Sequence, residues 1–528
     1  MAAGTDGYDV IVVGAGSAGC AAAARLSEEP SRRVLLLEAG PHDVGTQFTT
    51  PALNGRLYKT EWDWDLATEP ERELGGRRAY LPRGRVLGGT SSINSMVYTR
   101  GNPRDYDAWA ELGIEGWSYG EVLPYFLRAE DNERGPSPYH GVGGPLRVSE
   151  GRHRSRLVEA WLESAVAAGL PFNDDFNGPD QYGVGRYQVT QRNGRRVSAS
   201  TAYLGPARGR PNLTIRTGAY AVRIQLDAGR AVGVETIVDG EPRSFRADGE
   251  VVLSAGAYGT PQILMFSGIG PARHLEDHGV PVVVGNDAVG ANLRDHVGCF
   301  VSYRARVESL YRADTAENRR RLDEEGLGPL ASNGPEAGGF VNAPGRESAV
   351  PQLQFHAVPS LFLDEGLSPA DGDGFSLSAY VTKPQSTGRV MLRSPQVLSK
   401  PRIRHDYLTV PEDRELLREG VALAMETVLR PPLLGLLQDP ARSAAEGLAP
   451  ASDSTADLDA FVTRTAFSFF HPVGTASLGT VVDAQLRVLG VEGLRVADVS
   501  VLPTLVAANT NAPAMMIGER VAAFLADG

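Results

Sequence analysis

Three glycines and one acidic residue near the start of the chain have the spacing of a nucleotide-binding turn. Gly14, Gly16 and Gly19 form the pattern Gly-x-Gly-x-x-Gly, and Glu38 follows 19 residues after the last glycine. The first glycine permits a tight turn, the second lets the backbone approach a pyrophosphate, and the third lets helix and strand pack closely. Since Glu38 could accept hydrogen bonds from a ribose diol, the motif predicts a dinucleotide site. It leaves NAD and FAD open, and a glycine turn without ligand is the alternative.

The segments around this turn are those that a dinucleotide site requires. Residues 8–13 form a β-branched apolar run, residues 20–26 are rich in alanine, and residues 34–37 form a second apolar run that ends at Glu38. This order predicts strand, glycine turn, helix and second strand, with unpaired N–H groups and a positive dipole at the start of the helix. The chain is therefore expected to be an α/β protein with a Rossmann-like domain.

Two later segments repeat the combination of glycine and small polar residues. Gly84, Gly88 and Gly89 precede a Thr-Ser-Ser run, and their backbone N–H groups could hold a phosphate or a polar ring edge. A surface loop is the alternative. Residues 250–264 read as an apolar strand, a small-residue turn and a helix that starts at Thr-Pro. Because the pattern between these segments is not a repeating βαβ run, it argues against a simple nicotinamide dehydrogenase.

Composition sets the size and excludes one class of partner. The chain has 528 residues, of which 42% are hydrophobic and 22% charged, so at least two domains with a buried core are expected. With 52 basic and 64 acidic residues, the formal charge of −12 argues against nucleic acid as a partner. The 61 glycines exceed the roughly 37 expected at an average usage of about 7%, which indicates many tight turns.

Cysteine content and hydropathy indicate the compartment. The two cysteines, Cys20 and Cys299, could form no more than one bridge, as is usual in a reducing cytosol. The start of the chain has no basic stretch, and the apolar run at residues 10–13 is too short for a signal peptide. No uncharged apolar window approaches eighteen residues, so no transmembrane helix is expected. A cytoplasmic location is the prediction.

Several sequence blocks together resemble the glucose-methanol-choline (GMC) family of flavoprotein oxidoreductases over nearly the whole chain. The blocks are Gly14–Gly19 with Glu38, Gly84–Asn94, Gly256–Pro261, Ser267–Pro271, His471–Thr475, Gly493–Asp498 and Asn509–Asn511. The resemblance implies FAD as cofactor and a Rossmann-like FAD-binding domain with an inserted substrate-binding domain built on an antiparallel sheet. It places the FAD-binding domain at residues 5–155, 200–295 and 465–528, and the substrate-binding domain at 156–199 and 296–464.

The resemblance also implies which residues contact the cofactor. Those expected in the glycine turn are Gly14, Gly16, Ser17, Ala18 and Gly19. Those expected around the adenosine are Glu38, Ala221 and Ala257, with Trp64 beside the cofactor. Those expected along the ribityl chain and the flavin are Arg85, Val86, Gly89, Asn94, Met96, Val97 and Asp498, with the helix start at Ala512. The positive N-terminus of that helix would stabilise negative charge on the reduced ring.

The resemblance implies that His471 and Asn511 carry the chemistry. Oxidation of an alcohol to an aldehyde or ketone needs a base for the hydroxyl proton, and histidine has a suitable pKa near about 6.5. His471 is expected to be this base, with Asn511 as the hydrogen-bonding partner that donates to the developing alkoxide. Because the cofactor accepts the hydride, no metal and no protein nucleophile are needed. A flavin-dependent lyase or decarboxylase on the same scaffold, or a flavin-binding protein without turnover, are the alternatives.

Four residues are candidates for the substrate pocket. Phe469 and Phe470 directly precede His471, where they would form an apolar wall or belong to the core. His356 lies in the middle of the chain, where members of the family line the substrate site. Glu336 resembles in placement an acid that meets the cationic head group in choline-oxidising members, and a solvent-facing carboxylate is its alternative. Aryl, alkyl and amino alcohols all stay open as substrates.

One residue departs from the pattern of the family and bears on the cofactor. Some members, choline oxidase among them, tether FAD through a histidine in the loop where this chain has Ile93. The chain is therefore expected to hold FAD without a covalent bond. The predicted partners are a small-molecule alcohol and either oxygen or another electron acceptor. The polar segments 308–348 and 438–455 could form lids or the contacts of a homodimer.

Overall fold

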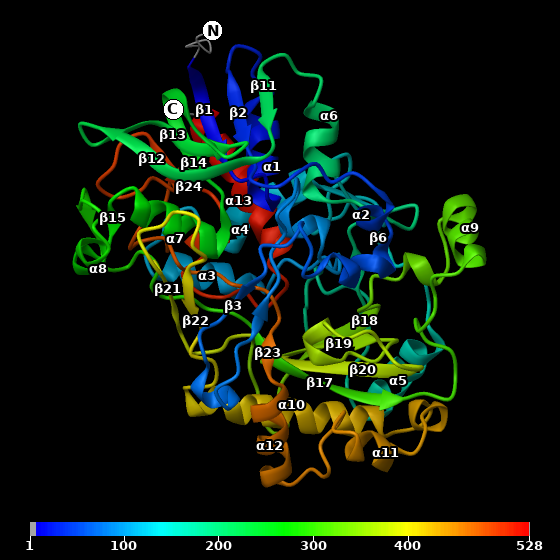
Figure 1. Ribbon diagram of the computed structural model, residues 1–528. Helices are drawn as coiled ribbons and strands as arrows, with labels where there is room; N and C mark the ends of the chain where they lie inside the picture. The colour runs from blue at the N-terminus through cyan, green and yellow to red at the C-terminus, as the bar shows by residue number, and fades with distance from the viewer. Residues whose placement is uncertain (1–6, 527–528) are drawn as a thin grey trace.

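A computed structural model of the chain shows two principal β-sheets, one above the other in Figure 1, with helices packed around them. The structure describes residues 7–526. The first six residues, to which the signal-peptide prediction and the start of the predicted FAD-binding domain belong, lie outside this range. Within residues 7–526, no helix combines the length and the apolar character needed to cross a bilayer.

The first sheet has seven strands, and its centre is parallel. The parallel strands are β11 (Leu213–Arg216), β2 (Val34–Leu37), β1 (Tyr8–Val13), β14 (Glu241–Leu253) and β24 (Leu494–Val496). β12 (Ala219–Asp227) and β13 (Arg230–Val238) extend the first half of β14 as an antiparallel meander. All four residues of β2 are buried, as expected for a parallel strand covered on both faces.

Two helices of small residues pack together beneath this sheet. α1 (Ser17–Leu26) begins four residues after β1 ends, and α13 (Asn511–Ala526) crosses it. At the crossing, a Cβ added to Gly518 would lie 2.2 Å from the carbonyl oxygen of Ala18. The glycine therefore sets how closely the last helix approaches the helix of the glycine turn.

The second sheet has six antiparallel strands drawn from distant parts of the chain. In order they are β23 (Phe467–Ser468), β17 (Val297–Arg304), β20 (Gly374–Val381), β19 (Leu353–Val358), β18 (Ala337–Val341) and β7 (Gly183–Arg186). α10 (Pro411–Val428) packs against β17 and β20, and α5 (Arg156–Ala167) lies next to it. This architecture confirms the predicted fold class. The exact domain boundaries stay a prediction, and β23 belongs to the antiparallel sheet although residues 465–528 were assigned to the FAD-binding domain.

The remaining elements surround these two sheets. The α-helices are α2 (Thr46–Thr49), α3 (Pro103–Glu111), α4 (Tyr119–Ala129), α6 (Gly205–Ala207), α7 (Gly256–Phe266), α8 (Ala272–Asp277), α9 (Ala316–Glu325), α11 (Pro440–Ala445) and α12 (Thr455–Thr465). A three-stranded sheet consists of β5 (Glu130–Asn132), β6 (Leu146–Glu150) and β8 (Gln188–Val189). α9 projects from the side of the molecule in Figure 1, and its Arg320 pairs with Glu317 and Glu324. Cys20 and Cys299 are buried and free.

A Gly518→Ala exchange tests the close crossing of α1 and α13. The new methyl group would meet the backbone of Ala18, so we expect a loss of about 1–3 kcal/mol in the free energy of unfolding, measured by denaturant titration of the holoenzyme. Gly120→Ala is the matched control, because Gly120 lies in α4 with nothing within 4 Å of an added Cβ. We expect that control to stay within about 1 kcal/mol of wild type. Equal losses in both variants would contradict the close crossing.

Candidate active site

A cavity of about 1110 Å³ connects the glycine turn to His471. Its lining includes Gly14 and Glu38 at the edge of the parallel sheet, and His356 and Phe300 from the antiparallel sheet. The cavity therefore joins the predicted nucleotide end to the predicted catalytic end. It lies at the carboxyl ends of β1 and β2, where ligands bind in open α/β sheets.

The three glycines of the first turn differ in what surrounds them. Gly14 has a φ of +98°, and a Cβ there would lie 2.5 Å from the carbonyl oxygen of Ser254. At Gly19 a Cβ would lie 1.9 Å from the carbonyl oxygen of Gly14, so this glycine serves packing and does not line the cavity. A Cβ at Gly16 would meet nothing within 4 Å. Gly16 lines the cavity with Gly14, Ser17 and Ala18, so the backbone is open to a ligand where the motif requires it.

Glu38 lies at the end of β2 and lines the cavity. Its carboxylate accepts hydrogen bonds from the backbone N–H groups of Ala15, at 2.9 Å, and Gly40, at 2.7 Å. Burial raises the pKa of this carboxyl to about 7, against the lowering effect of those two bonds. Glu38 therefore lies beside the glycine turn. If the turn binds the pyrophosphate of a dinucleotide, Glu38 is placed to bind the adjoining ribose.

The second glycine loop meets the first across the cavity. A Cβ at Gly89 would lie 2.7 Å from the Cα atom of Gly16, so the second loop depends on glycine at this contact. The residues of this loop and of neighbouring segments that line the cavity are Arg85, Gly89, Ile93, Asn94, Met96 and Val97, with Trp64, Ala221 and Ala257. The guanidinium of Arg85 lies 5.5 Å from the ring of Trp64, and its Nε is buried without a hydrogen-bond partner.

Besides Gly19, two predicted cofactor residues do not line the cavity. The side chain of Val86 is fully buried in a cluster with Phe48, Leu57 and Ile93. Ala512 is buried in the core of the first sheet, while Asn511 and Ala514 of the same helix face the cavity. The side chains of Val86 and Ala512 therefore point into the core, and a contact of their backbone with FAD stays a prediction.

Asp498 lines the cavity and accepts hydrogen bonds from the start of α7 and from the short 3-10 helix at residues 499–501. One oxygen accepts from the backbone N–H of Gly256, at 2.9 Å, and the hydroxyl of Thr260, at 2.6 Å. The other accepts from the backbone N–H of Ser500 at 2.8 Å. Burial raises the pKa of Asp498, and these bonds oppose that shift. The residue orients the N-terminal turn of α7 at the cavity.

At the other end, His471 belongs to a chain of polar contacts. Its Nδ1 lies 2.8 Å from Nδ1 of His296, and its Nε2 lies 3.1 Å from the amide nitrogen of Asn509. Nε2 of His296 lies 2.9 Å from the carbonyl oxygen of Thr382. Burial lowers the pKa of His296 to about 3. Burial, with additional effects of His296, His356 and Arg83, also holds the pKa of His471 well below its ordinary value.

These contacts assign the tautomer of His471. Because a carbonyl oxygen only accepts, neutral His296 carries its proton on Nε2 and its Nδ1 is an acceptor. His471 must then donate from Nδ1, which leaves the lone pair on Nε2. The amide of Asn509 donates to that nitrogen, since its oxygen accepts from Gln354, at 3.1 Å, and Thr99, at 3.2 Å. His471 and Asn509 both line the cavity, so an unprotonated imidazole nitrogen stands there.

The asparagine that contacts His471 is therefore Asn509, whereas Asn511, the residue predicted to donate a hydrogen bond in the reaction, does not contact the histidine. Asn511 is the first residue of α13, and its side-chain oxygen accepts from the hydroxyl of Ser17 at 2.6 Å. It lines the cavity nearer to the glycine turn. The sequence places two asparagines on either side of Thr510, and their type alone does not tell which one faces the histidine.

Of the four predicted pocket residues, three line the cavity. His356, Phe469 and Phe470 do so, and Phe469 stacks on Tyr380 with ring centroids 4.3 Å apart. Burial lowers the pKa of His356 to about 3. Phe300, Phe362 and Phe467 complete the aromatic wall. Sequence reasoning missed Phe300, Phe362, His296 and Asn509, because no local motif joins them to His471.

Glu336 does not line the cavity, and its prediction as a pocket residue is wrong. Its carboxylate lies 2.6 Å from Nδ1 of His153 and accepts from the hydroxyl of Ser332 at 2.6 Å. The second oxygen accepts from the backbone N–H of Ser155 at 2.9 Å, at the N-cap of α5. The positive end of that helix holds the acid, which has a structural role.

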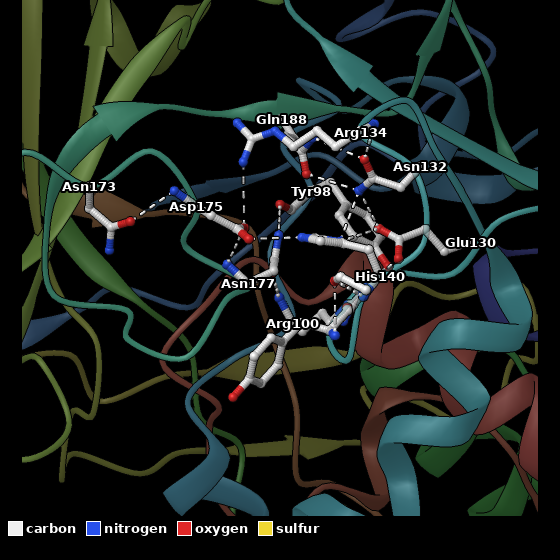
Figure 2. A network of polar contacts seen from close by, with 12 residues as sticks. Tyr98, Arg100, Glu130, Asn132, Arg134, His140, Asn173, Asp175, Asn177 and Gln188 are labelled. Atoms are coloured by element: carbon white, nitrogen blue, oxygen red, sulfur yellow. Dashed lines mark hydrogen bonds and ion pairs between the residues drawn. The ribbon is translucent and has the colours of Figure 1, made fainter.

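A buried polar network, shown in Figure 2, surrounds Tyr98 and Arg100, which flank Thr99 in the sequence. His140 lies between two acids, with Nδ1 3.3 Å from Glu130 and Nε2 2.9 Å from Asp175. Arg100 pairs with Glu130, and its backbone N–H donates to Asn177 at 2.9 Å. Burial alone would lower the pKa of His140, but the bonds to both acids outweigh it and raise the pKa to about 9. The network positions the segment whose Thr99 orients Asn509.

With this geometry in place, the comparisons with known proteins identify the family. Two family models, both described as GMC oxidoreductase, match residues 8–298 and 384–518. Choline dehydrogenase from Homo sapiens, a mitochondrial protein, is 40% identical and covers 98% of this chain and 89% of its own. The crystal structure of pyridoxine 4-oxidase from Mesorbium loti is 32% identical, with a TM-score of 0.87 and 99% of each chain covered. A structure of formate oxidase from Aspergillus oryzae, whose title names FAD modification, is 26% identical with a TM-score of 0.90 over 99% of each chain.

The chain belongs to the GMC oxidoreductase family. It is thus an FAD-dependent oxidoreductase that acts on CH–OH groups. The site fits that cofactor. The open backbone at Gly16, the contact of the two glycine loops and the unpartnered Nε of Arg85 all lie along one cavity.

The network around His140 predicts a pH-dependent stability. The folded pKa of about 9 lies above the unfolded value of about 6.5, so the stabilisation is fully present below the unfolded pKa and is lost as pH rises through the folded one. We expect His140→Gln to lower the free energy of unfolding of the holoenzyme by about 1–3 kcal/mol at pH 6 and by less at pH 10. The exposed His42→Gln exchange is the control. An equal loss for His140→Gln at both pH values would contradict a charged His140.

Proposed function

We propose that this chain oxidises an alcohol to an aldehyde or ketone, with His471 as the base and Asn509 as its hydrogen-bonding partner. The observation that carries the proposal is the tautomer of His471, whose Nε2 has its lone pair in the cavity and whose Nδ1 is committed to His296. Bound FAD supplies the acceptor for the hydride that leaves the alcohol carbon.

The residues around His471 would divide the work as follows. Nε2 of His471, which accepts from the amide of Asn509 before substrate binds, takes the hydroxyl proton once the alcohol replaces that hydrogen bond. The depressed pKa keeps this nitrogen unprotonated at neutral pH. The amide of Asn509, oriented by Thr99 and Gln354, donates to the substrate oxygen as negative charge develops on it. α13 begins two residues after Asn509, and its positive N-terminus favours negative charge at this end of the cavity.

FAD would be held without a covalent bond. Ile93, at the position where some members of the family have the tethering histidine, lines the cavity and has no nucleophile. Neither Cys20 nor Cys299 lines the cavity, and Cys20 donates to the carbonyl oxygen of Ala15 at 3.1 Å. The contacts available to the cofactor are therefore the backbone of the two glycine loops and the side chains of Arg85, Trp64 and Glu38.

Single exchanges at His471, Asn509 and Asn511 test the proposed chemistry. We expect His471→Ala to slow alcohol-dependent flavin reduction by a factor of about 10²–10⁴, because the base is lost. Asn509→Ala should slow it more than Asn511→Ala, since only Asn509 contacts His471. The measurement is anaerobic stopped-flow absorbance at about 450 nm, the region where oxidised flavin absorbs, with the bound-FAD spectrum as control. Reduction by His471→Ala at the wild-type rate would remove His471 from the mechanism.

The decrease of kcat/KM on the acidic side of the pH profile should occur at unusually low pH. The pKa of His471 is depressed, so the base is already unprotonated at pH values below its ordinary value of about 6.5. We expect kcat/KM for an alcohol to be constant from about pH 6 upward and to fall only in more acidic buffer. If kcat/KM instead fell with an apparent pKa at or above about 6.5, the base would be a different residue or His471 would lie in a different environment.

Acid precipitation of the purified holoenzyme tests how the cofactor is held. Because Ile93 offers no tether, we expect all of the flavin in the supernatant and none in the washed pellet. Flavin that stays with denatured protein would contradict non-covalent binding. Peroxide formation and dye reduction, followed in parallel, will identify oxygen or another acceptor.

A further inference from the structure

The part of the cavity next to His471 is an aromatic chamber, made by Phe300, Phe362, Phe467, Phe469 and Phe470. Phe300 stacks on Phe362 with ring centroids 4.2 Å apart, and Phe300 and Phe469 are 5.6 Å apart. Phe470 is also 6.0 Å from Phe467. The chamber is continuous with the histidine, because the backbone passes directly from Phe470 to His471. Its surface suits an apolar substrate body.

The acids that line the cavity are committed elsewhere. Among the described residues, the lining contains Glu38, Asp63 and Asp498. Glu38 and Asp498 bind backbone N–H groups at the nucleotide end, as described above. Asp63 is 6% exposed, and its oxygens accept from the backbone N–H groups of Lys59, Asp65 and Arg83 and from the hydroxyl of Tyr80. None of the three offers a free carboxylate to a cationic head group in the chamber.

A positive and an acidic side chain both lie against the chamber, and only the positive one lines the cavity. Asp295 is buried and accepts from the backbone N–H of His471 at 2.7 Å and from the hydroxyl of Ser468. The guanidinium of Arg83 donates through Nη2 to the carbonyl oxygen of Phe470 at 2.5 Å, and Arg83 lines the cavity. Its charge contributes to the lowered pKa of His471. Arg56 and Arg312 also line the cavity, and Arg56 pairs with Asp314 at 2.8 Å. A substrate cation in the chamber would thus lose its hydration and meet like charge.

We propose that the substrate is an uncharged alcohol with an apolar aryl or branched alkyl body, and that the site selects against alcohols with a quaternary ammonium group, choline included. This inference rests on the proposed function and specifies its substrate class. The human relative named choline dehydrogenase therefore differs from this chain in specificity despite 40% identity.

Aromatic rings can attract a quaternary ammonium group, so their arrangement matters. Cation–π attraction requires ring faces turned toward the cation within about 6 Å of the centroid. Here the faces of Phe300 and Phe362 are stacked on each other, and Phe469 stacks on Tyr380. Stacking covers one face of each of these rings. Without a free carboxylate, the ring surface that remains exposed compensates little of the hydration free energy that a cation loses.

The direct test compares choline with its neutral isostere, 3,3-dimethylbutan-1-ol, on the purified holoenzyme, with benzyl alcohol as a third alcohol. We expect kcat/KM for the isostere to exceed that for choline at least tenfold, and benzyl alcohol to be oxidised. Choline oxidised as well as the isostere, or better, would overturn the inference and leave the proposed function intact. If no alcohol in the set reduced the flavin, the proposed function and the inference would both fall.

A pair of variants separates charge from size. Val358 lies at the end of β19 and lines the cavity. We expect Val358→Glu to raise the ratio of kcat/KM for choline over the isostere at least tenfold relative to Val358→Gln, which has the same size without the charge. Bound-FAD absorbance would verify that both variants are folded. Equal ratios in the two variants would show that the missing carboxylate is not what excludes choline, and would overturn the inference.

Discussion

The hydrogen-bond chain from the carbonyl of Thr382 through His296 to His471 and Asn509 is the interaction on which the site depends. Each contact determines the next, because a carbonyl can only accept and a neutral imidazole has one donor and one acceptor. The result is an unprotonated imidazole nitrogen at the cavity, which suits the base that we propose. Because these hydrogen-bonded residues are buried, the pKa values of His296 and His471 are lowered and both rings are neutral.

The two sheets position this chain from opposite sides. His296 directly precedes β17, and Thr382 directly follows β20. The antiparallel sheet therefore positions the carbonyl of Thr382 and the imidazole that donates to it. Asn509 lies just before α13, which crosses α1 beneath the parallel sheet. Since Gly16 directly precedes α1, this pair of helices fixes where Asn509 lies relative to the open backbone of the glycine turn. This explains why the close crossing at Gly518 matters for the site.

Local motifs predicted the parts of this arrangement that depend on backbone. The turn at Gly14 and Gly19 is predictable from sequence because a side chain at either position would collide with nearby backbone. The collision at Gly14 is with Ser254, which directly follows the adjacent strand β14, and that at Gly19 is with Gly14 itself. The fold class followed from the same blocks. Asn509 and Asn511 could not be separated, since the choice depends on which turn of the chain meets His471.

The differences from the sequence-based expectations have the same physical origin. Glu336 was expected at the substrate because its position in sequence suited that role, but the N-terminus of α5 approaches from a distant segment and binds it. The side chain of Val86 turns into an apolar cluster that no local pattern reveals. Long-range packing decided each case, and it also assembled the aromatic chamber from three separate segments.

Histidine ¹⁵N NMR of the holoenzyme tests the central claim most directly, with His471→Gln used to assign the signal. The account predicts a neutral His471, protonated on Nδ1 and unprotonated on Nε2, throughout the range in which its depressed pKa keeps it uncharged, including neutral pH. An imidazolium at neutral pH, or a proton on Nε2, would contradict the account.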